Sequence, residues 1–402
     1  MNVTRGIGGS SAARELAELK PWALPAPLIG KAERLRRLEK AQRLMATIGA
    51  DALIVGAGPS LRYFTGVAWG ASDRLVAAVI PAGRDPVMIC PAFESGSLEA
   101  SLAIDASIHP WEEDESPFRL VARLVATWGA SVLAFDPALS FQVFNGLRKE
   151  SASCSIVDAA PVIDECRMIK TESELALMQQ AKQMTLEVQR RAARILHSGI
   201  RASEVKRFID AAHRLLGADA GSSFCAVQFG EATAFPHGLP GDQTLHEGDV
   251  VLIDTGCQVD GYNSDITRTY VFGEATPEIA RIWSLEKEAQ EAAFSVARPG
   301  IKCQDVDLVA RQYIERAGLG PGYQLPGLPH RTGHGIGLSI HEPPYLVRGD
   351  LTPLRTGMCF SNEPMIVVPG AFGVRLEDHF HVTHQGASWF TPPQPSLEAP
   401  FG

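Results

Sequence analysis

The sequence lacks the features typical of secreted, membrane or nucleic-acid-binding proteins. Its seven cysteines are odd in number and scattered, and none forms a Cys-x-x-Cys pair. We therefore expect free thiols in a reducing cytoplasm and no thiolate zinc site. The longer apolar runs, such as Leu75–Ile80, have the length of a strand and not of a membrane span. The formal net charge of −9 provides no basic surface for nucleic acid or for an anionic membrane.

The first 30 residues have no apolar stretch like that of a secretory signal peptide. Arg5 is followed by mixed charges and by three prolines, so we expect no signal peptide and interpret residues 1–30 as an extension. A chain of 402 residues with 45% apolar side chains exceeds the usual size of one compact domain. We expect an N-terminal α/β domain over 1–165, including the extension, and a second domain over 166–402.

Helical and strand-like segments alternate in the first domain, which favours a mostly parallel or mixed sheet. The second domain opens with Thr171-Glu-Ser-Glu174, a capping box that predicts the start of a long helix. Strand and turn patterns dominate the end of the chain. The predicted helices cover 31–47, 117–127, 171–196, 202–216, 278–297 and 303–317, and the predicted strands of the first domain cover 52–55, 75–80, 86–90 and 131–135.

The second half contains acidic residues within strand-like apolar segments. Two such segments flank Asp260-Gly261, a pair typical of the type I′ turn of a hairpin. A two-residue turn would place Asp254 opposite Thr267. Because residues two apart share a face of a strand, Asp254 and Asp265 would then lie on the same face. The spacing therefore brings two carboxylates within reach of a common ion.

A second hairpin is expected around a turn rich in proline and glycine. If Val368 pairs with Phe372, Glu363 lies directly opposite Glu377, and Arg375 shares the face of Glu377. Two acids that face each other across a sheet destabilise it. This pairing therefore indicates a function, since stability alone would not select it.

Taken singly, each of these acids is most simply a solvent-exposed carboxylate at a strand edge. Four carboxylates gathered in half-buried strands repel each other unless cations neutralise them. The stretch 330–341 adds three histidines and three glycines, and glycine lets a backbone approach a site closely. His334 is then the natural nitrogen ligand, while His330 and His341 are available as donors to an oxyanion. His237, in Phe235-Pro-His-Gly238, is a weaker candidate, because taken alone it fits a structural loop histidine at least as well.

Oxygen ligands with a single nitrogen and no thiolate suit Mn²⁺, with Co²⁺ and Zn²⁺ as plausible substitutes. We therefore expect two divalent metal ions, held mainly by oxygen. Such a pair lowers the pKa of a bound water, which makes the chain a candidate metal-dependent hydrolase.

At these residues the chain resembles the metallopeptidase family of prolidases, aminopeptidases P and methionine aminopeptidases, which have the pita-bread fold. Order and spacing fit over about residues 165–402. The first half resembles the N-terminal domain of the creatinase–prolidase branch, which methionine aminopeptidases lack. The matching segments are Leu252-Ile-Asp-Thr-Gly256, Asn263-Ser-Asp-Ile-Thr-Arg-Thr269, Gly333-His-Gly-Ile-Gly337 with His341-Glu-Pro, Ser361-Asn-Glu-Pro364 and Val374-Arg-Leu-Glu-Asp378, and in the first half Tyr63-Phe-Thr-Gly66 and Arg167-Met-Ile-Lys-Thr171.

The resemblance implies an α+β fold class in which a pita-bread catalytic domain follows a smaller α/β creatinase-type domain. It also implies a homodimer. Glu363 would act as general base, and His237, His330 and His341 would hold the substrate and the tetrahedral intermediate. The residues that the resemblance assigns to two metal ions are Asp254, Asp265, His334, Glu363 and Glu377.

One position departs from the family pattern. Many aminopeptidases P and prolidases have a tyrosine four residues after the glutamate of the Glu-Pro motif, and Val367 stands at that position here. A hydrogen-bond relay through this tyrosine to Arg375 and Asp254 must therefore be absent or replaced.

The predicted function is hydrolysis of the Xaa-Pro bond of dipeptides, so the partner is a small peptide with proline at its second position. The alternatives are an aminopeptidase P acting on longer peptides, a related ectoine- or creatine-type hydrolase, and a non-catalytic binding protein on the same fold. The complete ligand set argues against the last two. A dinucleotide loop at Gly56-Ala-Gly58 is disfavoured because Leu61 occupies the place of its third glycine.

Overall fold

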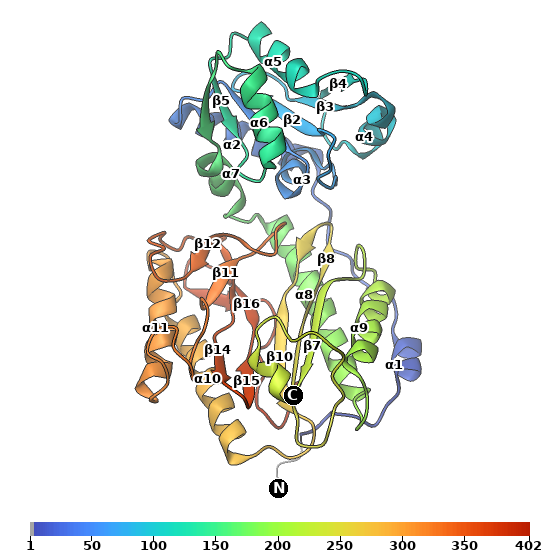
Figure 1. The fold of residues 1–402 in the computed structure, drawn as a ribbon, viewed down its shortest axis with the longest axis vertical. Coiled ribbons are helices and arrows are strands. Elements are labelled where there is room, and N and C mark those ends of the chain that lie inside the picture. The colour runs from blue at the N-terminus through green and yellow to red at the C-terminus, as the bar shows by residue number, and fades with distance from the viewer. Residues whose placement is uncertain (1–3) are drawn as a thin grey trace. The chain divides into compact units, whose positions relative to one another are not determined.

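The computed structural model describes residues 4–402, which form two compact units (Figure 1). The smaller unit comprises residues 29–167, and the larger unit comprises residues 4–28 and 168–402. The predicted boundary at residue 165 falls inside the last helix of the smaller unit. Among the described residues, no helix has both the length and the apolar character needed to cross a bilayer.

The smaller unit is built on a mixed six-stranded sheet with strand order β4-β3-β2-β1-β5-β6. The pairs β1–β2 and β2–β3 are antiparallel and the other three are parallel, which confirms a mixed sheet. The strands are β1 (Ala52–Gly56), β2 (Ala77–Pro81), β3 (Val87–Pro91), β4 (Ser107–Trp111), β5 (Val132–Phe135) and β6 (Ser155–Asp158), and the helices are α2 (Lys31–Thr47), α3 (Pro59–Thr65), α4 (Ser95–Ser101), α5 (Pro117–Thr127), α6 (Phe141–Glu150) and α7 (Ala160–Arg167).

Several of these elements were not predicted from the sequence. The helices α3 and α4 have seven residues each, which is too short for an amphipathic period to be visible. The strands β4 and β6 lie at the two edges of the sheet and are only partly buried, so they lack the continuous apolar run of the central strands.

The larger unit consists of two halves, each with a pair of helices beside a sheet (Figure 1). In the first half, α8 packs on β8 and α9 packs on β7 of the sheet β10-β8-β7. In the second half, α10 and α11 contact each other beside the sheet β12-β11-β13-β16-β17 and the two-stranded sheet β14-β15. This arrangement is the pita-bread fold.

The helices of the larger unit are α1 (Ala12–Glu18), α8 (Glu172–Arg194), α9 (Ala202–Leu216), α10 (Pro277–Val296) and α11 (Cys303–Arg316), and its strands are β7 (Ser222–Phe229), β8 (Val250–Val259), β9 (Tyr262–Asn263), β10 (Ile266–Val271), β11 (Gly333–Gly335), β12 (Glu342–Leu346), β13 (Cys359–Asn362), β14 (Met365–Val368), β15 (Phe372–Arg375), β16 (Asp378–Val382) and β17 (Ala387–Trp389). The predicted capping box begins α8. The Thr171 hydroxyl accepts from the Glu174 amide, and the Glu174 carboxylate accepts from the Thr171 amide at 2.9 Å.

Residues 4–28 are not the loose extension that the sequence suggested. The Gly8 amide donates to the Ala193 carbonyl at 2.9 Å, and the Trp22 amide donates to the Leu216 carbonyl at 3.0 Å. The Glu15 carboxylate is buried and lies 3.0 Å from the Arg191 guanidinium. These bonds fasten the segment to α8 and α9, so it belongs to the larger unit and not to the N-terminal one.

Candidate metal centre

The first hairpin has the predicted register. Asp260 and Gly261 both have positive φ, as a type I′ turn requires, and Asp254 pairs with Thr267. The strand is interrupted between β9 and β10, and Asp265 lies in this interruption. A side chain at Gly256 would come within 1.9 Å of the Ser264 carbonyl oxygen, so the close approach of the two backbones depends on glycine there.

The second hairpin also has the predicted register, because Val368 pairs with Phe372 and Asn362 pairs with Asp378. Glu363 and Glu377 lie in the gap between these two paired segments, where the hairpin divides into different sheets. The Glu363 amide donates to the Thr332 carbonyl at 2.8 Å, and the Glu377 amide donates to the Thr267 carbonyl at 3.1 Å. The two acids thus occupy opposite positions while their backbones bond to other strands.

The imidazole of His334 is positioned by the glycine-rich strand β11. A Cβ at Gly333 would lie 2.1 Å from the Ser361 carbonyl oxygen, and one at Gly335 would lie 2.3 Å from the Glu342 carbonyl oxygen. The predicted close approach of this backbone is confirmed. His334 Nδ1 lies 3.0 Å from the Gly335 carbonyl oxygen, so it carries the proton and Nε2 presents its lone pair.

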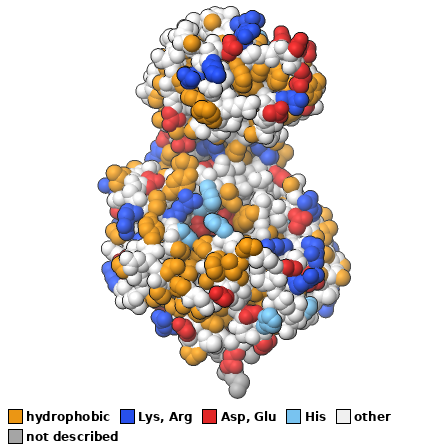
Figure 2. Space-filling view, in the orientation of Figure 1, with side chains coloured by type: hydrophobic (Ala, Val, Ile, Leu, Met, Phe, Trp, Pro, Cys, Tyr) orange, Lys and Arg blue, Asp and Glu red, His pale blue; other side chains and the backbone are white. Residues whose placement is uncertain are grey.

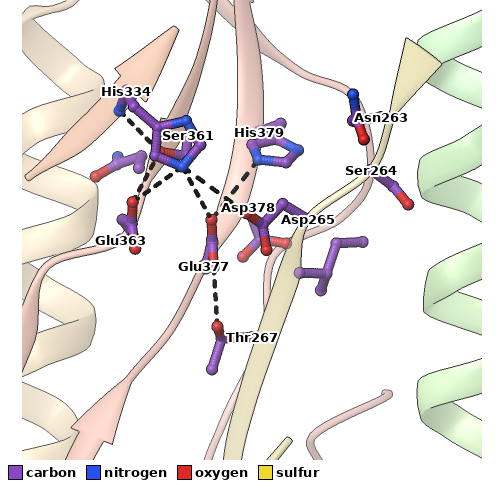
Figure 3. A network of polar contacts seen from close by, with 12 residues as sticks. Asn263, Ser264, Asp265, Thr267, His334, Ser361, Glu363, Glu377, Asp378 and His379 are labelled. Atoms are coloured by element: carbon purple, nitrogen blue, oxygen red, sulfur yellow. Dashed lines mark hydrogen bonds and ion pairs between the residues drawn. The ribbon is translucent and has the colours of Figure 1, made fainter. Parts of the chain in front are cut away.

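Three of the four predicted carboxylate ligands lie around this nitrogen (Figure 3). His334 Nε2 lies 3.2 Å from Glu363 Oε1, 3.8 Å from Asp265 Oδ2 and 4.0 Å from Glu377 Oε1. The charge of Asp254, the fourth carboxylate, is close enough to raise the pKa of both Asp265 and Glu377. In the space-filling view, histidine and acidic side chains gather in a hollow on the visible face of the larger unit (Figure 2).

The electrostatics of the cluster favour a bound cation. Burial and the neighbouring carboxylates raise the pKa of Asp265 and of Glu377 well above the usual range. Burial also opposes ionisation of Glu363, but the charged form of the His334 ring, with a proton on Nε2, outweighs it and lowers the pKa of this carboxyl. A cation bound at the neutral ring would supply the same positive charge. Within residues 4–402, one buried oxygen each of Asp254, Asp265 and Glu377 has no hydrogen-bond partner. Buried carboxylate oxygens without donors fit divalent ions, which would satisfy them and relieve the repulsion.

Arg375 supports the cluster from behind. Its Nη2 donates to Asp254 Oδ2 at 2.5 Å, and its Nε donates to the Thr267 hydroxyl at 3.0 Å. The expected tyrosine position, Val367, is buried, and its backbone bridges to Gly327. Arg375 thus contacts Asp254 directly, with no side chain of residue 367 between them.

The remaining predicted histidines lie around the cluster with different exposure. His341 is exposed. Its ring packs edge to face against the ring of His334, with the two ring centroids 4.2 Å apart. The pKa of His341 is lowered to about 4, mainly because its ring is partly removed from solvent. The positive charges of His334 and Arg331, and more weakly that of His237, lower it further. His237 is exposed on the loop after η2 (Gly230–Ala234).

The ring of His330 carries its proton on the nitrogen that faces the backbone, which does not fit its predicted role as a donor to the substrate. Its Nδ1 lies 2.7 Å from the Arg331 carbonyl oxygen, and burial lowers the pKa of the ring. A carbonyl can only accept, so Nδ1 carries the proton of the neutral ring. Nε2, which is buried and has no hydrogen-bond partner in the described chain, is therefore an acceptor and not a donor.

Sequence reasoning missed one histidine at the cluster. His379 is fully buried on β16, and its Nε2 lies 3.7 Å from Glu377 Oε1 (Figure 3). Burial, and then the Lys182 ammonium, lower its pKa well below the usual value, so the ring is neutral. The available signal was its position two residues after Glu377, which puts both side chains on one strand face. Thr267, Arg268, Ser361 and Asp378, which orient the ligands, were also not singled out.

The pita-bread fold and a cluster of buried carboxylates around one imidazole are together typical of metal-dependent hydrolases. The chain belongs to metallopeptidase family M24, whose model matches residues 176–384, and a creatinase/prolidase N-terminal domain model matches residues 37–169. The family implies divalent metal ions at the cluster. The chain is therefore a metallopeptidase.

Individual relatives match over nearly the whole chain. A Mycobacterium tuberculosis protein named "Probable dipeptidase PepE" is 35% identical over 88% of this chain and 92% of the relative. The structure of dipeptidase PepE from Mycobacterium ulcerans superposes with a TM-score of 0.85 at 32% identity, covering 93% of this chain and all of that one. The prolidase from Thermococcus sibiricus gives a TM-score of 0.83 at 30% identity, covering 91% and 98%.

Proposed function

We propose that the protein hydrolyses the Xaa-Pro bond of dipeptides with two divalent metal ions held by Asp254, Asp265, His334, Glu363 and Glu377. The observation that carries the proposal is that Asp254, Asp265 and Glu377 each have a buried oxygen without a hydrogen-bond donor in the described chain. The one on Glu377 lies 4.0 Å from His334 Nε2. The relatives named dipeptidase and prolidase support the choice of substrate.

The proposed chemistry needs an ionised base beside the reacting water. Divalent ions bound here would lower the pKa of a water and polarise the scissile carbonyl. Glu363 is the base: its lowered pKa keeps it ionised, and the Ser361 hydroxyl at 3.1 Å orients its carboxylate. It would take the proton of the attacking water and pass it to the leaving proline nitrogen.

The histidines around the cluster would divide substrate binding between them. His330 offers Nε2 as an acceptor, which suits an N–H of the substrate and not an oxyanion. Donation to the oxyanion falls to His341, which stands against His334. His237 would hold the substrate from the exposed loop. Arg375, also expected in the catalytic set, would act by holding Asp254 through their direct contact.

Several further properties belong to the proposal. The prevalence of oxygen ligands suits Mn²⁺, with Co²⁺ or Zn²⁺ as substitutes. All seven cysteines are free, which supports a cytoplasmic location. We assign catalysis to the larger unit, in place of the domain at 166–402 that the sequence suggested, and the creatinase-type domain to residues 29–167, in place of 1–165. A homodimer stays a prediction from the family resemblance.

The test compares Ala-Pro, Ala-Pro-Ala and Met-Ala as substrates of the full-length protein after chelation and after Mn²⁺ re-addition. We expect metal-dependent cleavage of Ala-Pro alone. Equal or faster cleavage of Ala-Pro-Ala would instead identify an aminopeptidase P. Undiminished activity in the double variant Asp254→Asn, Glu363→Gln would overturn the metal mechanism.

A further inference from the structure

His379 is a fully buried imidazole beside the proposed metal ligands. It lies on β16 opposite Ser361, and its Nε2 is directed at Glu377 Oε1 from 3.7 Å (Figure 3). Over the described residues, neither ring nitrogen has a hydrogen-bond partner. A histidine that serves only to fill a core normally bonds through at least one nitrogen, because an unpaired buried polar group is costly. The two unpaired ring nitrogens of His379 therefore indicate a bound partner other than the described polypeptide.

Among the described residues, three groups of three donor atoms could each hold an ion, and two of these groups contain Glu377. One group is His334, Glu363 and Glu377, and the other is Asp265, Glu377 and His379; within each, every donor atom lies within 4.8 Å of the others. The groups share Glu377 and differ in their imidazole. Two ions that share a carboxylate would thus each have a nitrogen donor of their own.

We propose that His379 is a second imidazole ligand of the centre, binding through Nε2 the ion that Asp265 and Glu377 hold. This inference rests on the proposed function, because it needs two ions at the cluster. It departs from the expected ligand set, in which His334 is the only nitrogen. A second imidazole makes the donor set softer, so it favours Co²⁺ and Zn²⁺ relative to Mn²⁺.

Cobalt-substituted full-length protein gives a readout that does not depend on activity. A histidine that binds paramagnetic Co²⁺ through Nε2 shows a strongly shifted, exchangeable proton NMR signal from its Nδ1–H. His334 should give one such signal, since its Nδ1 carries the proton. We expect a second from His379, whose complete burial protects it from solvent exchange. The number of shifted signals is counted in the wild-type protein, so this result does not depend on whether any variant folds.

Variants assign the second signal. His379→Leu should remove it and raise the dissociation constant of one Co²⁺ at least about tenfold, a loss typical even of an outer hydrogen bond at a metal site. The control is His381→Leu. His381 lies on the same strand, and its ring centroid is 5.1 Å from that of Phe390. It should keep both signals and both affinities. His341→Leu should also keep both signals, although His341 forms a group of its own with Asp265 and His334.

The results separate this inference from the proposed function. Two bound Co²⁺ with a single shifted signal would overturn the role of His379 and leave the dinuclear centre intact. A second signal that survives His379→Leu, or disappears in His341→Leu, would also overturn it. A protein that binds no Co²⁺ would overturn both proposals together.

Discussion

The Thr267 hydroxyl donates to Glu377 Oε2 at 2.9 Å, across strands that are 110 residues apart in the chain. The same hydroxyl oxygen accepts from Arg375 Nε at 3.0 Å. Thr267 therefore connects the two hairpins and fixes the side chain of Glu377, whose other oxygen has no hydrogen-bond donor in the described structure. Outer hydrogen bonds of this kind orient a ligand before the metal arrives.

We predict that Thr267→Val weakens metal binding about 10- to 100-fold, because valine keeps the shape and removes the hydroxyl that holds Glu377. Thr267→Ser keeps the hydroxyl and should stay near the wild-type affinity. Isothermal titration with Mn²⁺ measures both. Equal affinities for the valine and serine variants would show that the hydroxyl has no such role.

Replacement of the proposed base should separate catalysis from metal content. We expect Glu363→Gln to lower kcat by about 10²- to 10⁴-fold, the usual contribution of a general base. Glu291→Gln is the matched control, since that carboxylate is 60% exposed and forms an ion pair with Lys287. Steady-state kinetics on Ala-Pro, with metal content measured in parallel, tests the prediction. A kcat close to that of wild type would exclude Glu363 as the base.

The hairpin registers could be predicted because they depend on local chemistry. Asp260-Gly261 accommodates positive φ at both positions, and this turn alone sets Asp254 opposite Thr267. The contact between Thr267 and Glu377 joins separate hairpins, and no spacing within either one indicates it. His379 was missed for a related reason: in sequence it is one polar residue of a strand, and only the tertiary fold brings Asp265 near it.

The N-terminal segment shows the same limit. Its prolines and mixed charges resemble a loose extension, yet its backbone donors and the buried Glu15 find partners on α8 and α9. Short polar segments of this kind take their structure from the surface that they contact, and periodicity in the segment itself does not report that surface.

The close approach of β11 to β13 should not tolerate a side chain at Gly333. A Cβ there would lie 2.1 Å from the Ser361 carbonyl oxygen, which belongs to the backbone and cannot rotate away. We expect Gly333→Ala to reduce the free energy of unfolding by about 1–3 kcal/mol and to weaken metal binding by displacing His334. Gly96→Ala, where a Cβ meets nothing within 4 Å, is the control and should be neutral or stabilising. A Gly333→Ala protein with wild-type stability would contradict the contact.

Behind Glu377 lies an ion pair that is fully closed to solvent. Arg268 Nη2 donates to Asp378 Oδ1 at 2.7 Å, both side chains are 0% exposed, and Arg268 Nη1 also donates to the Glu377 carbonyl at 3.1 Å. Removal of one partner leaves the other charge buried without compensation, so Arg268→Leu and Asp378→Leu should each lower the free energy of unfolding by about 3–5 kcal/mol.

The double variant Arg268→Leu, Asp378→Leu removes both charges and should lose much less than the sum of the two single changes. Urea denaturation of the four proteins completes this cycle. Because Arg268 also holds the Glu377 backbone, both proteins that lack it should bind metal more weakly, even where stability is recovered. Additive losses in stability would show that Arg268 and Asp378 act independently, which their contact at 2.7 Å predicts they do not.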